Sequence, residues 1–136
     1  MHTHAKLLSC LGLLPFVGFA LASYLAVLPA DTATTAFLLY SALILSFLGG
    51  VHWSQAVLSK PNVMQAYVAM LPSLIGWCAL LLLPESAALW LLCAAYLFIL
   101  LYDMHTLDMP DGYLSLRIAL TTLVVLCHLL LLLPRP

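Results

Sequence analysis

Few side chains in this sequence can do acid–base or ligand-binding chemistry, and most of those few lie inside or beside long apolar stretches. Six are ionisable or strongly polar: His52, Gln55, Asp103, His105, Arg117 and His128. Burying such groups in an apolar medium is costly unless a partner or a function compensates. These residues are therefore the first candidates for a site that binds a small molecule or moves a proton.

Helical spacing groups the candidates in the first half of the chain. Gly49, His52 and Gln55 recur every three residues, so they share one helix face, and the glycine leaves room beside the imidazole. Trp53 directly follows His52, near what we expect to be the end of this helix. The face that carries Trp77 is compatible with a flat aromatic ligand and equally compatible with packing.

Two further helices carry the remaining candidates. Tyr96 and Asp103 lie two turns apart on one face, aimed at the same end of the protein as Arg117. This arrangement predicts an ion pair between Asp103 and Arg117. Arg117, Thr121 and His128 also recur at helical spacing among leucines, which could form a proton relay.

Together these patterns predict one polar pocket near one membrane face. Its expected members are His52, Trp53, Gln55, Trp77, Tyr96, Asp103, Arg117 and Thr121. The alternative is purely structural: the charged residues hold helix ends together, His52 and Gln55 reach the interface, and the tryptophans anchor the protein there.

The composition defines the elements that must position these side chains. Hydrophobic residues make up 65% of the 136 residues and charged residues only 7%, too few for the surface of a soluble domain. The apolar residues form long runs and do not alternate, which indicates helices that cross a lipid bilayer.

We therefore predict an all-α polytopic membrane protein, a bundle of five transmembrane helices in one domain over residues 1–136. The expected spans cover residues 7–28, 36–58, 63–83, 86–102 and 114–133. The first span resembles a signal peptide because Lys6 precedes an apolar stretch. That stretch is longer than the roughly 7–15 apolar residues of a signal-peptide core, so we expect the span to be retained.

Small residues predict how two of these helices pack. They recur every four residues in the first and second spans: Gly18, Ala22 and Ala26, then Ala42, Ser46, Gly50 and Ser54, with Gly49 beside them. Such stripes let backbones approach closely, so we expect the first and second helices, or two copies of either, to meet there.

Positive charges predict the orientation. With the N-terminus inside, Lys6, Lys60 and Arg117 fall on the inner side and only Arg135 on the outer side. The C-terminus is then outside. The few, scattered cations provide no footprint for nucleic acid, and the four cysteines contain no Cys-x-x-Cys pair that would indicate a metal site.

Three segments resemble a known family. They are YSALILSFLGGVHW (residues 40–53), LPSLIGW (71–77) and YLSLRIALT (113–121), and they resemble the small membrane proteins of the domain of unknown function 3429 family. The resemblance implies a bacterial or mitochondrial inner membrane but no established chemistry. The positions that match the recurring pattern are Ser46, Gly49, Gly50, Trp53, Pro72, Trp77, Asp103, Tyr113, Arg117 and Thr121.

Three functions remain open at this point. The first is an accessory subunit of a larger membrane complex, or a binder of a hydrophobic cofactor such as a quinone or haem, with its pocket near the cytoplasmic face. The second is a small transporter or proton pathway, expected to act as a homo-oligomer. The third, a membrane enzyme, would rest on the loop that carries Asp103, His105, Asp108 and Asp111, but no partnered nucleophile and base accompany it.

The rise per residue of a helix tests whether two histidines could bind one haem, because both axial ligands must lie at the same membrane depth. His52 and His128 lie at depths that differ by about 13 Å at 1.5 Å per residue, so they cannot clasp one haem between them. A pair of His52 with His105 or Met104 remains open.

Overall fold

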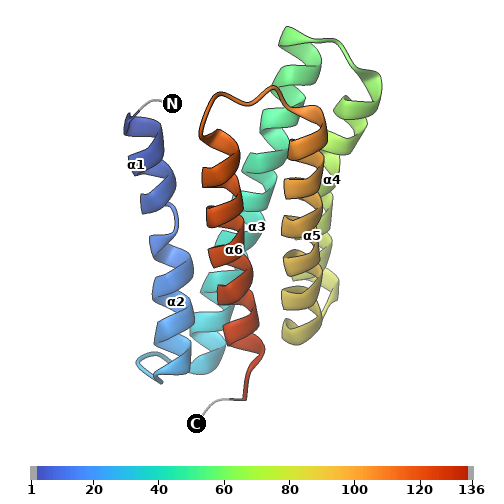
Figure 1. Cartoon of the computed structure of the whole chain (residues 1–136). Helices are drawn as coiled ribbons and strands as arrows, with labels where there is room; N and C mark the ends of the chain where they lie inside the picture. The colour runs from blue at the N-terminus through green and yellow to red at the C-terminus, as the bar shows by residue number, and fades with distance from the viewer. Residues whose placement is uncertain (1–2, 135–136) are drawn as a thin grey trace.

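The computed structural model describes residues 3–134, and its regular elements there are all helical. They are α1 (Thr3–Leu11), α2 (Leu14–Tyr24), α3 (Ala30–Ser54), the π-helix η1 (Gln55–Ser59), α4 (Val63–Leu82), α5 (Glu85–Thr106) and α6 (Tyr113–Leu132). They form five segments long and apolar enough to cross a bilayer, because α1 continues into α2 and α3 into η1. The predicted fold class is confirmed (Figure 1).

The first span is broken between α1 and α2. Pro15 stands in the first turn of α2, where its missing amide hydrogen does least harm, and its ring would clash with the carbonyl of a continuous preceding turn. The hydroxyl of Tyr40 donates to the carbonyl oxygen of Gly12 at 2.8 Å, which satisfies a backbone group that the break exposes. Pro72, in contrast, lies inside α4 without ending it.

Two spans are longer than expected. α3 begins at Ala30, directly after Pro29, because a proline followed by Asp31 in the first turn is a helix-start signal that outweighs the low hydropathy there. α5 continues to Thr106 and therefore includes Asp103. Hydropathy alone would end this helix at Tyr102, but the carboxylate has buried partners that keep it within the bundle.

Residues 3 and 134, the first and last that the structure describes, lie at opposite ends of the bundle (Figure 1). The N-terminal end of α1 lies on the same side as the loop at residues 60–62 and the loop at residues 107–112, as consecutive antiparallel spans require. Arg135 lies outside the described residues. In the second loop, Gly112 adopts a left-handed φ of 80°, which only glycine takes up without strain.

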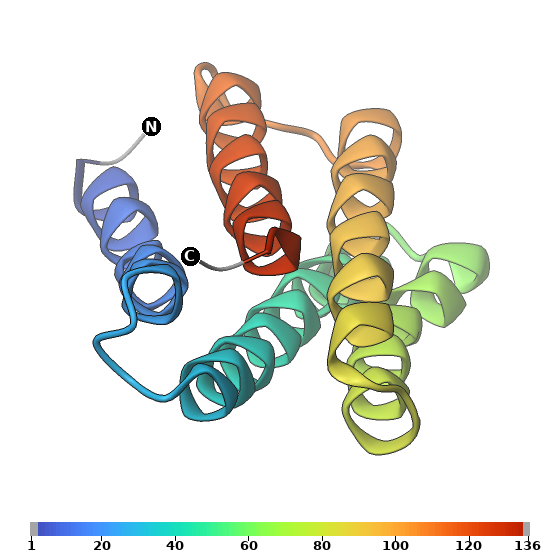
Figure 2. The ribbon, with the colours of Figure 1, turned by 90° about the horizontal axis from the view of Figure 1, so that it is seen from below.

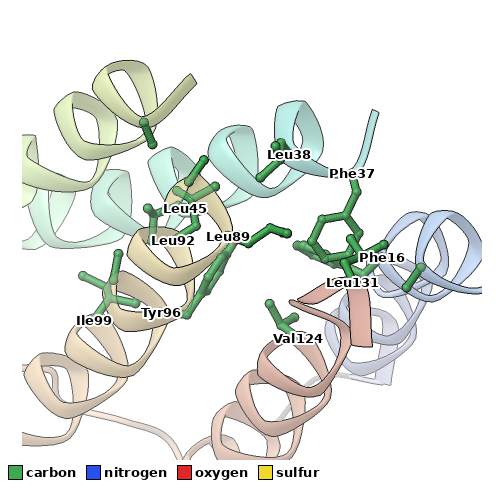
Figure 3. Packing of buried hydrophobic residues seen from close by; sticks show 14 residues of the cluster. Phe16, Phe37, Leu38, Leu45, Leu89, Leu92, Tyr96, Ile99, Val124 and Leu131 are labelled. Carbon is green, nitrogen blue, oxygen red and sulfur yellow. The ribbon is translucent and has the colours of Figure 1, made fainter. Parts of the chain in front are cut away.

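Packing gathers around an aromatic core. α3 packs against both α2 and α4, and α6 packs against α2 and α5 (Figure 2). Phe16 of α2 contacts Phe37 edge-on at a ring separation of 5.5 Å and Tyr96 at 6.2 Å (Figure 3). Many leucines point outward, as expected for a surface that faces lipid.

Within one chain, the small residues of the second span do not meet the first helix as predicted; a contact between two copies along either stripe stays a prediction. Ala42 and Ser46 face α4 and not α2: a Cβ on Gly76 would lie 3.1 Å from that of Ala42, and the hydroxyls of Ser46 and Ser73 are 2.6 Å apart. Gly49 approaches α4 most closely, since a Cβ there would lie 2.6 Å from a backbone carbonyl oxygen of that helix.

Three other members of the stripes make no close helix contact within the described part of the chain. Gly18 and Gly50 face open space, and Ser54 is exposed. Ala22 lies in α2, but Ala26 follows the end of that helix with a φ of 58°. The physical reason is that a four-residue step turns about 400° around a helix of 3.6 residues per turn, so the stripe drifts off the contact face within three steps.

Candidate functional site

The predicted ion pair between α5 and α6 is confirmed. Oδ2 of Asp103 accepts hydrogen bonds from Nε and Nη2 of Arg117, at 3.0 and 2.6 Å. Both side chains are buried, at 3% and 6% exposed. An ion pair removed from solvent depends on its geometry and on further hydrogen bonds, and both partners here have them.

His52 joins this pair to the second and third spans. Its Nε2 lies 2.5 Å from Oδ1 of Asp103, and its Nδ1 lies 3.0 Å from Nε2 of Gln65. The same Gln65 amide donates to Oε1 of Gln55 at 3.1 Å. With the amide nitrogen of Gln65 turned toward it, Nδ1 of His52 accepts a hydrogen bond, and Nε2 donates one to Asp103.

Thr121 completes the group on α6. Nη1 of Arg117 donates to its hydroxyl oxygen at 3.3 Å. The polar network therefore comprises His52, Gln55, Gln65, Asp103, Arg117 and Thr121, and we use this name for these six residues. Arg117 and Asp103 contribute one positive and one negative charge to the polar network, and these two charges are paired.

Gln65 was missed by the sequence reasoning, although a local signal exists. The side-chain oxygen of Asn62 accepts from the backbone amide of Gln65 at 3.1 Å, so the spacing Asn-x-x-Gln marks a helix start. This cap sets the direction of the first turn of α4, where Gln65 is 2% exposed. A buried glutamine at the start of an apolar span needs partners, and His52 and Gln55 supply them.

Gln55 is the first residue of the π-helix η1. The amide of Lys60 donates to the carbonyl oxygen of Gln55 at 2.9 Å, a five-residue step that widens the turn. Lys60 itself pairs with Asp108 across the two loops at this end, and both side chains are largely exposed.

His128 belongs to a second polar group, nearer the other end of the bundle. Its Nδ1 donates to the carbonyl of Val124 at 2.7 Å, and its Nε2 accepts from the hydroxyl of Ser41 at 2.7 Å. Tyr96 donates to the carbonyl of Ser41 at 2.5 Å. Thr121 lies about 10 Å along the helix axis from His128. Within residues 3–134 no hydrogen bond joins the two groups, so of the predicted relay only Arg117 and Thr121 are connected.

The tryptophans lie apart from the polar network. Trp53 is 48% exposed and Trp77 is 62% exposed, and neither has a polar contact with the network in the described part of the chain. His105 is also exposed, and its Nδ1 bonds the carbonyl of Leu101 at 2.8 Å.

A cavity of about 310 Å³ opens beside the polar network, between the first span, α3, α5 and α6. We call it the groove. Its walls are mainly apolar, and its polar contributors are Ser9, Tyr96, Arg117 and Thr121. The residues that line it are Leu8, Ser9, Gly12, Leu13, Phe16, Ile44, Phe47, Leu48, Tyr96, Arg117, Leu120, Thr121 and Val124.

The histidines do not fit a haem. Both ring nitrogens of His52 and of His128 are already engaged in hydrogen bonds, and both side chains are fully buried. Neither ring therefore has a lone pair available for iron. The described residues also contain no group of three side chains that could hold a metal ion.

The chain is similar to known proteins over almost its whole length. Residues 1–133 match the family described as "Protein of unknown function (DUF3429)". The chain is 34% identical over 129 residues to Transmembrane protein 69 of Xenopus tropicalis, which covers 89% of this chain and 50% of that protein. It thus spans about half the length of this curated relative. No solved structure gives a significant match. The chain therefore belongs to the DUF3429 family of multi-pass membrane proteins.

Proposed function

We propose that this protein binds a lipid-soluble small molecule in the groove, with the polar head of the molecule at Arg117 and its apolar body between the first span and α6. Small-molecule sites in proteins are mostly apolar cavities of about 300–1,000 Å³ with a few polar groups that fix orientation. The groove has this character, and its volume of about 310 Å³ suits a single-ring head better than a macrocycle.

One observation carries the proposal. Arg117 is 5% exposed, yet it contributes to the wall of the groove. A guanidinium has five N–H donors, and three of those on Arg117 bond Asp103 and Thr121. Within residues 3–134 the other two have no partner. Unbonded donors beside an apolar cavity favour a ligand that accepts hydrogen bonds.

The first span supports entry from the bilayer. α1 has no buried residue, and the break at Gly12 separates it from the well-packed α2. Leu8 and Ser9 of α1 form part of the groove wall. A helix so weakly held can move aside at a low free-energy cost, which gives a hydrophobic molecule a route from lipid to the groove.

The positive-inside rule supports the location of the site. Lys6 and Lys60 lie at the same end of the bundle as Arg117, so this end is expected to face the cytoplasm or the mitochondrial matrix. The polar head would then bind at the inner leaflet. An accessory role in a larger inner-membrane complex is compatible with this placement, and the proton pathway is less favoured because its two polar groups are not connected.

Native mass spectrometry of the mildly solubilised protein tests the proposal. We expect a retained small molecule on the wild-type chain. Ser9→Trp fills the groove and should abolish retention, whereas Cys10→Trp, on the exposed side of the same helix, should not. Wild-type protein without any adduct, or equal adducts on all three chains, would show that the groove is not a binding site.

A further inference from the structure

We infer that the ligand of the groove has an uncharged carbonyl head, such as that of a quinone; this inference rests on the proposed function. Its first basis is the hydrogen-bonding character of the wall. Arg117 offers two unbonded N–H donors and no acceptor. The hydroxyl oxygen of Thr121 accepts from Arg117, so its hydrogen is free to donate.

The second basis is charge. The positive charge of Arg117 is already paired with the negative charge of Asp103 at 2.6 Å. A carboxylate or phosphate in the groove would therefore add an uncompensated negative charge at membrane depth, where desolvation is strongly unfavourable. A carbonyl oxygen accepts the same hydrogen bonds without this penalty.

The third basis is the shape of the site. Arg117 and Thr121 line the groove from α6, while Leu13 and Phe16 of the first span and Leu48 of α3 contribute an apolar surface. A flat ring can present its carbonyl edge to Arg117 and its face to this surface. Two of the residues that line the groove are aromatic, Phe16 and Tyr96, and they contact each other edge-on at 6.2 Å.

Competition between three probes with alkyl tails of similar length tests the inference. Decylbenzoquinone, decylbenzene and decanoate are offered together, and native mass spectrometry reads their relative occupancy on the wild-type protein. We expect decylbenzoquinone to bind at least about tenfold more tightly than either other probe, the ratio that a charge-assisted hydrogen bond supplies. Equal occupancy by decylbenzene, or preference for decanoate, would overturn the inference.

Two variants separate this inference from the proposed function. Ser9→Trp should exclude all three probes; if it excludes none, the groove itself is not the site and the proposed function fails. Arg117→Lys should reduce decylbenzoquinone to the level of decylbenzene while decylbenzene still binds. If Arg117→Lys does not fold, the three-probe comparison on the wild-type protein still decides the question.

The carbonyl could belong to a quinone or to the ester of a membrane lipid, and the bilayer distinguishes these sources. In nanodiscs of ester-linked phosphatidylcholine and of its ether-linked analogue, decylbenzoquinone should bind equally tightly if the site is built for a quinone. Weaker binding in the ester-linked lipid would assign the site to the ester carbonyl and overturn its assignment to a quinone.

Discussion

Replacement of Asp103 by asparagine removes the anion from the centre of the polar network. In the wild-type protein Asp103 accepts two hydrogen bonds from Arg117 and one from His52. Asparagine has nearly the same size, so packing should change little. The amide oxygen of asparagine can still accept a hydrogen bond from Arg117, but the buried guanidinium no longer has a compensating negative charge.

The magnitude distinguishes this effect from the loss of ordinary hydrogen bonds. Removing one partner of a buried ion pair costs about 3–5 kcal/mol, whereas a neutral hydrogen bond between membrane helices contributes only about 0.6 kcal/mol on average. We therefore expect Asp103→Asn to lower the free energy of unfolding by about 3–5 kcal/mol. That is a large part of the roughly 5–15 kcal/mol of a typical domain.

The assay is unfolding in mixed micelles with rising SDS, followed by circular dichroism. The matched control is Asp108→Asn, which breaks the exposed pair with Lys60 and should change stability by no more than about 1 kcal/mol. The double variant Asp103→Asn/Arg117→Gln restores neutrality and should recover part of the loss. Equal effects of Asp103→Asn and Asp108→Asn would refute the reasoning.

Three further predictions concern the backbone, and the same unfolding assay checks them. Gly49→Ala should destabilise the protein by about 1–3 kcal/mol, because the new Cβ would meet the carbonyl oxygen of Ala69. Gly50 faces open space, so the control Gly50→Ala should be neutral or slightly stabilising. Equal effects of the two substitutions would contradict the close contact at Gly49. Ala26→Gly should stabilise by about 1 kcal/mol, since φ is 58° in the turn that ends α2. Gly112→Ala should destabilise by a similar amount at φ 80°, and a gain in stability would refute the strain at this loop.

The five spans and the ion pair could be predicted from the sequence. Each depends on a local residue pattern and on one general rule for membrane proteins, which concerns backbone hydrogen bonding for the spans and charge pairing for the ion pair. Long apolar runs have one stable solution in lipid, and this determined the fold class. Asp103 and Arg117 are opposite charges at the same end of neighbouring helices, so each was the natural partner of the other. His52 and Gln55 were predicted to join this pair because the expected topology places them at the same end of the bundle.

Other features could not be predicted because they depend on which helix faces are in contact. Gln65 was overlooked because its partners come from a different span, even though Asn62 marks the helix start. The stripe through Ala42 and Ser46 indicated a close contact but not its partner, which is α4. An aromatic residue such as Trp77 suits lipid and ligand equally, and only the fold shows that it faces outward.

The most direct test of ligand binding in the groove is to locate the ligand by photolabelling. An azido-substituted decylbenzoquinone is bound to the protein, activated by light, and its adducts are mapped by peptide mass spectrometry. We predict adducts on residues of the groove such as Leu13, Leu48 and Leu120, all lost in Ser9→Trp. Adducts spread over the lipid-facing surface around Trp77, and unchanged by Ser9→Trp, would contradict the account.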